Sequence, residues 1–247
     1  MSGFLAVARR EIHGFFVLPI AYIVLTVWLL YFGLVFSIMA DLLSASPTGA
    51  GLMTTFFGGT VLFYLPLLVF APVLTMRLLA EERSSGTLEP LLTAPVSEWS
   101  VVLGKYAAAL VFWLSLWAPT LLYFWIVAGF AADAVDLGAM AATYLGVFSI
   151  GLLYMAVGLL MSALSRTQIA AALLTFLVLG CLFLLGLRAY ATQDDAERAL
   201  YEYLGVWTQM GTFAKGIVDT RFLIFDVTVA ALSVFAAVRV VQSNRWQ

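Results

Sequence analysis

The chain has 247 residues, of which 64% are hydrophobic and 11% are charged, and its mean hydropathy is +1.04. Soluble domains contain about 45–50% apolar and about 25% charged residues, so the composition excludes an ordinary soluble protein. A net charge of −2 excludes a nucleic-acid partner on electrostatic grounds. The single cysteine, Cys181, excludes an intramolecular disulfide and a paired-cysteine metal or redox site. These properties predict an all-α membrane protein.

Stretches without charge define the predicted membrane spans, because a charge near the bilayer centre costs at least about 2.5–3.5 kcal/mol. A weaker candidate near the carboxyl end contains Asp226, which lies so close to the start of the span that we expect its carboxylate to reach the interface. Pro66 and Pro72 are expected to kink the second span. We predict a single transmembrane domain, residues 1–247, with six spans at about 15–40, 55–79, 102–130, 138–165, 168–187 and 222–242.

The lysine and arginine positions predict the orientation, because short cytoplasmic loops hold the excess of positive charge. A cytoplasmic amino terminus leaves four of the twelve basic residues outside, and these four share one segment with five acids. We therefore predict that both termini are cytoplasmic. The eight basic residues then placed inside are Arg9, Arg10, Arg77, Arg83, Lys105, Arg166, Arg239 and Arg245.

Two segments outside the spans have helical patterns. Residues 3–13 place Phe4, Leu5, Ala8 and Ile12 on one helical face, which predicts a short helix along the inner interface; the alternative is a basic flank that only sets topology. Residues 188–221, between spans five and six, interleave aromatic residues with charges. This pattern predicts short re-entrant or interfacial helices at the outer face, with a solvated loop as the alternative.

A third segment, the cytoplasmic loop at residues 80–100, also has helical signals. Thr87 can cap a short helix, Glu89 falls in its first turn, and Pro90 is tolerated at that position. Such a helix presents its leucines outside the bilayer, where they need a partner protein. The alternative is a linker whose leucines pack under the bundle.

Several function classes are disfavoured by what the sequence lacks. The chain has one histidine, His13, and no motif of a membrane protease, so a membrane enzyme is disfavoured and we assign no catalytic or metal-binding residue. Only Asp226 approaches the depth where ion-coupled transporters hold ionisable residues. A phosphate-binding loop is also missing, so we expect ATP hydrolysis to reside in another subunit. A non-transporting assembly scaffold is the remaining alternative.

The loop between spans two and three resembles the first cytoplasmic loop of ABC-2 type ATP-binding-cassette permeases. The resemblance rests on Glu81-Glu82-Arg83, on Gly86-Thr87-Leu88-Glu89, on Leu91-Leu92-Thr93-Ala94-Pro95-Val96-Ser97 and on Gly104-Lys105. Arg9-Arg10-Glu11 with Pro19-Ile20-Ala21-Tyr22, and the run from Phe213 to Arg221, are similar to the branch that holds the gliding-motility-associated permease and the nitrous-oxide-reductase maturation permease.

This resemblance implies a dimer of permeases, identical or related, with separate ABC ATPase subunits that bind ATP and Mg, while this chain binds no cofactor. It implies a location in the bacterial inner membrane and export of an amphiphilic or polymeric cargo. The alternative is transmission of ATPase motion to an extracytoplasmic or accessory protein. In such permeases a coupling helix contacts the ATPase, a role that the resemblance assigns to Glu82, Gly86, Thr87, Leu88, Glu89, Leu91 and Leu92.

Overall fold

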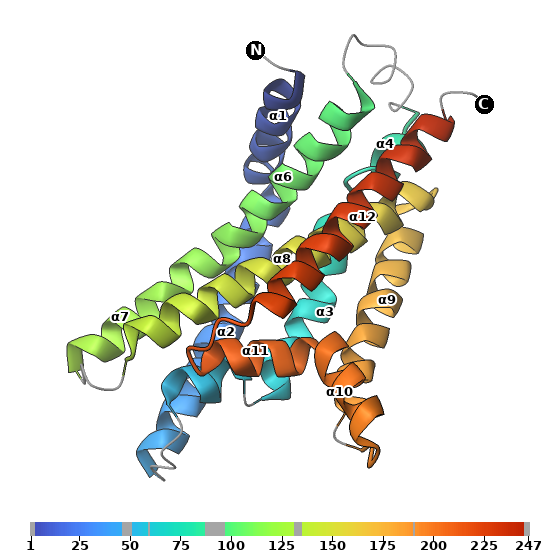
Figure 1. Cartoon of the computed structure of the whole chain (residues 1–247). Coiled ribbons are helices and arrows are strands. Elements are labelled where there is room, and N and C mark those ends of the chain that lie inside the picture. Colours follow the sequence, from blue (N-terminus) through green and yellow to red (C-terminus); the bar gives the residue numbers. More distant parts are fainter. Residues whose placement is uncertain are drawn as a thin grey trace.

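The computed structural model describes residues 3–45, 51–58, 60–86, 97–130, 135–189 and 191–244, and all regular elements in these ranges are helices. Figure 1 shows their arrangement as an elongated bundle. The elements are α1 (Gly3–Val17), α2 (Pro19–Ala45), η1 (Thr54–Gly58), α3 (Val61–Thr75), α4 (Ala80–Ser84), α6 (Glu98–Trp117), η2 (Ala118–Thr120), α7 (Leu121–Phe130), α8 (Leu137–Leu164), α9 (Gln168–Arg188), α10 (Asp195–Leu204), α11 (Val206–Ala214) and α12 (Thr220–Asn244).

Five of the described helical segments are long and apolar enough to cross a membrane. They are Pro19–Leu42, Glu98–Phe130, Leu137–Leu164, Gln168–Arg188 and Thr220–Ser243. The predicted second span is different, because it is divided into the π-helix η1 and the 15-residue helix α3. Both Pro66 and Pro72 lie inside α3, which is shorter than the roughly 20 residues of a typical span. A six-span topology therefore stays a prediction.

Two further helix boundaries depart from the hydropathy pattern, and a proline marks each. The first span, predicted to begin at about residue 15, begins at Pro19 in the structure, because α1 continues to Val17 and α2 starts at Pro19. Pro119 lies in the 3-10 turn η2, where the third span changes from α6 to α7. Proline has no backbone N–H and is accommodated at such positions.

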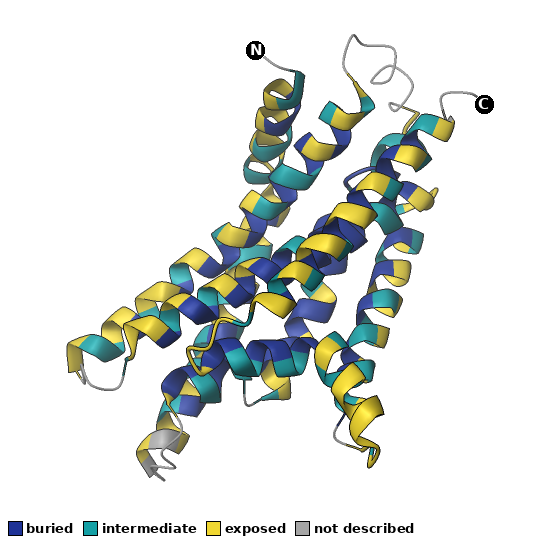
Figure 2. Ribbon diagram, in the orientation of Figure 1, coloured by how far each residue is buried: buried dark blue, intermediate teal, exposed yellow. Residues whose placement is uncertain are grey.

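Helix α8 forms the centre of the bundle. Within an apolar stretch of 18 residues in α8, 72% of the residues are buried. The helix packs against α3, α6, α9, α11 and α12. Glycines make these contacts close: a Cβ atom on Gly151 would lie 2.3 Å from Nε1 of Trp113, and one on Gly158 would lie 2.2 Å from Oγ1 of Thr75. Figure 2 shows the buried stripe along this helix and the exposed surfaces of the outer helices.

The two ends of the bundle carry different elements. The amino-terminal end of α1, helix α4, the start of α6 and the end of α12 lie at one end, whereas α7 and α10 lie at the other (Figure 1). All the described members of the basic set predicted to be cytoplasmic lie on or next to elements of the first end. The cytoplasmic location of that end stays a prediction.

The predicted helices outside the spans are longer or more deeply packed than the sequence indicates. Helix α1 extends to Val17 and packs on α6 through Val7 and Ala8, while Leu5, assigned to the apolar face, is 52% exposed. In the outer segment, the structure has α10, which buries no residue, and α11, which buries Met210 and Phe213. Helix α11 therefore packs into the bundle.

The expectation for Asp226 is wrong. Its side chain does not reach the interface but is buried, with 1% exposure, between α12, α8 and α11. Lys105, on α6, is also buried within a candidate span, with 2% exposure. Both ionisable groups have hydrogen-bonding or ion-pair partners on other helices, and local hydropathy does not identify these partners.

Candidate functional site

The base of the loop between α4 and α6 is the part of the expected coupling region that the structure describes. Helix α4 ends before Gly86, whose φ of 69° is in the left-handed region that favours glycine. Helix α6 begins after Ser97, whose hydroxyl caps it by accepting a hydrogen bond from the Ser100 amide. Of the seven predicted contact residues, the structure describes Glu82 and Gly86. Outside the described residues lie Thr87, Leu88, Glu89, Leu91 and Leu92.

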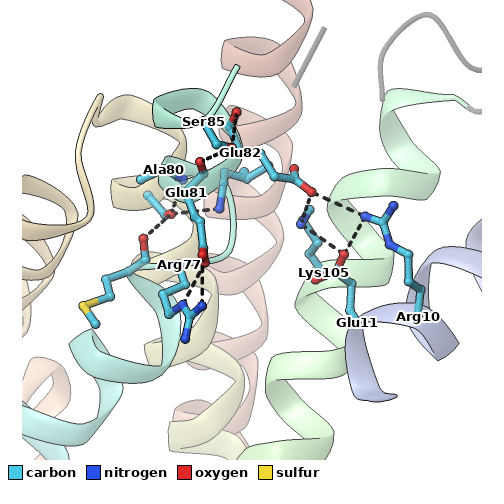
Figure 3. Close-up of polar contacts among 11 residues, drawn as sticks. Arg10, Glu11, Arg77, Ala80, Glu81, Glu82, Ser85 and Lys105 are labelled. Atoms are coloured by element: carbon cyan, nitrogen blue, oxygen red, sulfur yellow. Dashed lines mark hydrogen bonds and ion pairs between the residues drawn. The ribbon is translucent and has the colours of Figure 1, made fainter. Parts of the chain in front are cut away.

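A charged junction joins the two sides of this base. We use this name for Arg10 and Glu11 on α1, Glu82 on α4 and Lys105 on α6, which are drawn in Figure 3. The Lys105 ammonium lies 2.9 Å from Oε1 of Glu82 and 3.2 Å from Oε1 of Glu11. The Arg10 guanidinium bridges the same two acids, at 2.8 Å from Glu11 and 3.4 Å from Glu82. Two cations thus alternate with two carboxylates.

The packing of α1 on α6 places these charges together. A Cβ atom on Gly104 would lie 2.8 Å from Cγ1 of Val7, so only glycine permits this separation of the helices. Glu11 follows Val7 by four residues, about one helical turn, and therefore faces α6 beside Lys105. The Lys105 side chain is 2% exposed and Glu82 is 15% exposed, so water screens this pair less than a surface pair.

Helix α4 is also tied to α8 and to the end of α3. The Ser162 hydroxyl of α8 accepts hydrogen bonds from the amides of Leu79 and Ala80, each at 3.0 Å, which satisfies two of the free donors at the start of α4. Arg77 donates to both carboxylate oxygens of Glu81, at 2.7 and 2.9 Å. These hydrogen bonds hold the pKa of Glu81 below its usual value.

A cavity of about 150 Å³ lies beside the charged junction, between α1, α2, α6 and the segment from α3 to α4. Its apolar lining includes Phe15, Val24 and Phe112, and its charged lining includes Glu11 and Arg77. Among the residues that the structure describes, no group of three or more His, Cys, Asp or Glu is placed to hold a metal ion. The site therefore offers ion pairing and apolar packing.

Sequence reasoning assigned Glu82 to an ATPase contact and missed its partners within the chain. The pairing of Glu82 with Arg10 spans 72 positions and has no local signal. Lys105 had one signal that could have been used: it interrupts an otherwise apolar helix, and a buried cation requires an acidic partner. The side chain of Glu82 points to Lys105 and Arg10 in the charged junction (Figure 3).

The comparison with protein families adds an independent result. No curated protein sequence matches the chain. Residues 45–210 match the model of a family described as ABC-2 family transporter protein. This segment covers more than half of the 247 residues and includes the loop base, α4 and Lys105. The chain therefore belongs to the ABC-2 family of transporter proteins.

Proposed function

We propose that the chain is the permease subunit of an ATP-binding-cassette exporter, working as a dimer with a second permease chain and with separate ATPase subunits. Membership of the ABC-2 family makes the chain a multi-pass membrane component and implies an ABC ATPase partner. ATP and Mg belong to that partner in this proposal. The six-span topology, cytoplasmic termini and a bacterial inner membrane complete the proposal.

The charged junction carries the coupling part of the proposal. Glu82 precedes the loop at residues 87–96 and Lys105 follows it, yet their charged atoms are 2.9 Å apart. The ion pair therefore clamps the base of the loop, and Glu11 and Arg10 attach α1 to the same clamp. A displacement of the loop by a bound ATPase is then passed to α4, α6 and α1 together.

Helix packing provides a route from this clamp into the bundle. Helix α6 contacts α8 and α12, and through η2 it leads to α7 at the opposite end (Figure 1). Trp113 of α6 donates a hydrogen bond from Nε1 to the Val147 carbonyl of α8, at 3.1 Å. A movement of α6 therefore acts on the central helix, which also packs on α11.

We propose an amphiphilic or polymeric cargo from the resemblance to ABC-2 type permeases. The cavity beside the charged junction joins an apolar lining to charged groups, but its volume of about 150 Å³ is below the roughly 300–1,000 Å³ of small-molecule pockets, so we do not assign it as the cargo site. Transmission of ATPase motion to an extracytoplasmic partner without bulk transport is the second candidate, and the same clamp supports it. The branch of the gliding-motility-associated and nitrous-oxide-reductase maturation permeases is proposed on the residue resemblance alone.

One experiment on the permease–ATPase complex tests the coupling. A reporter cysteine replaces Met210 on α11, where the native side chain is fully buried, in a Cys181→Ser background. Its labelling by a water-soluble thiol reagent is compared with and without ATP and Mg. We expect the labelling rate to change with nucleotide, to become insensitive in Glu82→Gln, and to stay sensitive in Glu202→Gln, whose native carboxylate pairs with Arg198 in α10.

The outcomes separate the parts of the proposal. Labelling that ignores nucleotide in the wild-type complex contradicts coupling, while wild-type behaviour of Glu82→Gln contradicts the role of the charged junction. In proteoliposomes, ATP-driven movement of a fluorescent phospholipid supports export of an amphiphile. A nucleotide-dependent change at the reporter with no lipid movement favours mechanical transmission.

A further inference from the structure

Asp226 occupies the interior of the bundle, where three helices meet away from the charged junction. Its Oδ2 atom accepts a hydrogen bond from the Ser149 hydroxyl of α8 at 2.6 Å and another from the Gln209 amide of α11. Asp226 is 1% exposed, and Ser149 and Gln209 are 1% and 3% exposed. One carboxylate oxygen thus links α12 to both of the other helices.

The helices that supply these donors carry no compensating cation. Neither α8 nor α11, both described throughout, contains Lys, Arg, His, Asp or Glu. Tyr154 of α8 interacts electrostatically with Asp226 and is neutral when protonated. On α12 itself, Arg221 pairs with Asp219 and Arg239 bonds to Gln242.

Helix α6 also packs on α12, and its charged groups are committed elsewhere. The Lys105 ammonium contacts Glu11 and Glu82. The Tyr106 hydroxyl donates a hydrogen bond to the Leu152 carbonyl at 2.8 Å. Glu98, the remaining charged residue of α6, is an acid at its first position and supplies no positive charge.

The second oxygen of Asp226 distinguishes the two charge states. Among the described residues, Oδ1 is buried without a hydrogen-bond partner. An ionised carboxylate would leave negative charge on this oxygen with neither a donor nor a cation, which is the more unfavourable way to bury the group. A proton on Oδ1 removes the charge and leaves Oδ2 free to accept both observed hydrogen bonds; the neutral O–H then lacks an acceptor, which costs less than an unpaired buried charge.

We propose that Asp226 is a proton-binding site and that the bound proton holds α11 against α8 and α12. The proton resides on Oδ1 while α11 is seated. When α11 withdraws, Gln209 leaves, water reaches the carboxyl, and the O–H bond breaks to give a carboxylate and a hydrated proton. Seating α11 again requires the carboxylate to take up a proton from water.

Helix α11 covers Asp226 through close packing contacts with α8 and η1. Phe213 of α11 packs over Gly146 of α8, where a Cβ atom would lie 2.7 Å from the ring. Gly58 of η1 also lies close to the Gly211 backbone, since a Cβ atom on Gly58 would lie 3.0 Å from the Gly211 Cα. Such contacts allow little partial displacement, which favours a two-position helix.

The test uses the full-length chain in detergent, without nucleotide. The reporter Met210→Cys in a Cys181→Ser background follows exposure of the buried face of α11. Ile217→Cys, at a position that is 56% exposed in the segment after α11, corrects for the intrinsic pH dependence of thiol labelling. The normalised labelling rate is measured from about pH 5 to about pH 9, a range that brackets the titration of buried carboxyl groups.

We expect the normalised rate to rise with pH by up to about tenfold per pH unit, because each opening releases one proton. Asp226→Asn keeps an acceptor oxygen for Ser149 and Gln209 but cannot ionise, so its rate should be low and independent of pH. A wild-type rate that does not change with pH overturns the proposal, as does an Asp226→Asn profile equal to that of the wild type. Ser149→Ala, which retains the acid, should keep the pH dependence.

Discussion

Lys105 and Glu82 stand on opposite sides of the loop at residues 87–96, and their charged atoms are 2.9 Å apart. The Lys105 side chain is buried, and its ammonium also pairs with the Glu11 carboxylate. The described residues that flank this segment, Glu82 and Lys105, are thus held together by an ion pair.

Removing the buried cation should destabilise the permease strongly. Lys105→Met leaves Glu11 and Glu82 close together with only Arg10 beside them, and breaking one partner of a buried pair costs about 3–5 kcal/mol. Arg198→Met is the control, because it removes an exposed pair with Glu202 that contributes less than about 1 kcal/mol. Thermal unfolding in detergent measures both. Equal shifts for the two variants would show that the junction has no special energetic role.

Close packing of α8 should make Gly151 intolerant of a methyl group. Gly151→Ala would place Cβ 2.3 Å from the Trp113 indole nitrogen, and overpacking of this kind costs about 1–3 kcal/mol. Gly180→Ala on α9 meets no atom within 4 Å and should raise helix stability by up to about 1 kcal/mol. Thermal unfolding of both variants checks the opposite signs. A stabilised Gly151→Ala protein would contradict the described approach of α6 and α8.

The ion pair of Arg77 with Glu81 should give the protein an acid-sensitive contribution to stability. Because Arg77 lowers the pKa of Glu81 in the folded protein, the contribution is complete above the unfolded value, about 4.5, and is lost as pH falls through the lower folded pKa. The difference in unfolding temperature between wild type and Glu81→Gln should therefore shrink with acidification. If the difference in unfolding temperature grew as the pH fell, the ion pair would not lower the pKa of Glu81 in the folded protein.

The orientation can be tested at residues that the structure places at opposite ends of the bundle. In a Cys181→Ser background, a cysteine at Gln193, before α10, should react with an impermeant thiol reagent added outside cells. A cysteine at Ser85, after α4, should react only after the membrane is opened. The reverse pattern would mean that the basic residues near α1 and α4 face outward.

The sequence predicts α8, α9 and α12 to within a few residues, because charges and capping residues mark their ends. Asp136 and Thr167 cap α8 and α9 as short polar side chains do at helix starts. The division of the second span into η1 and α3 falls at Gly58-Gly59-Thr60, where a Gly-Gly pair precedes the N-cap residue of α3. A prediction based on hydropathy alone does not use this mark, so the break was missed.

The side-chain contacts of the candidate site were also not predicted from the sequence. Glu82 was predicted to act at the coupling loop, but its partner Lys105 lies 23 positions away and Arg10 lies 72 away. The burial of Asp226 depends on Ser149, 77 positions earlier, and on Gln209, 17 positions earlier. Contacts of this kind arise from the packing of helices that are distant in the sequence, and local sequence patterns do not specify that packing.

The most direct test of the permease assignment is binding of the ATPase subunit to the Leu91→Ser, Leu92→Ser double variant. Burial of one leucine contributes roughly 1.5–3 kcal/mol. Loss of two should therefore weaken ATPase association at least about tenfold, at about 1.4 kcal/mol per factor of ten. Leu200→Ser, at an exposed position of α10, is the control and should bind normally.

The measurement is co-purification of the ATPase together with thermal unfolding of the permease alone. If Leu91 and Leu92 contact the ATPase, the double variant loses the ATPase while its unfolding temperature stays at the wild-type value. Full retention of the ATPase, or loss of the permease's own fold, would contradict the assignment of these leucines to an ATPase contact.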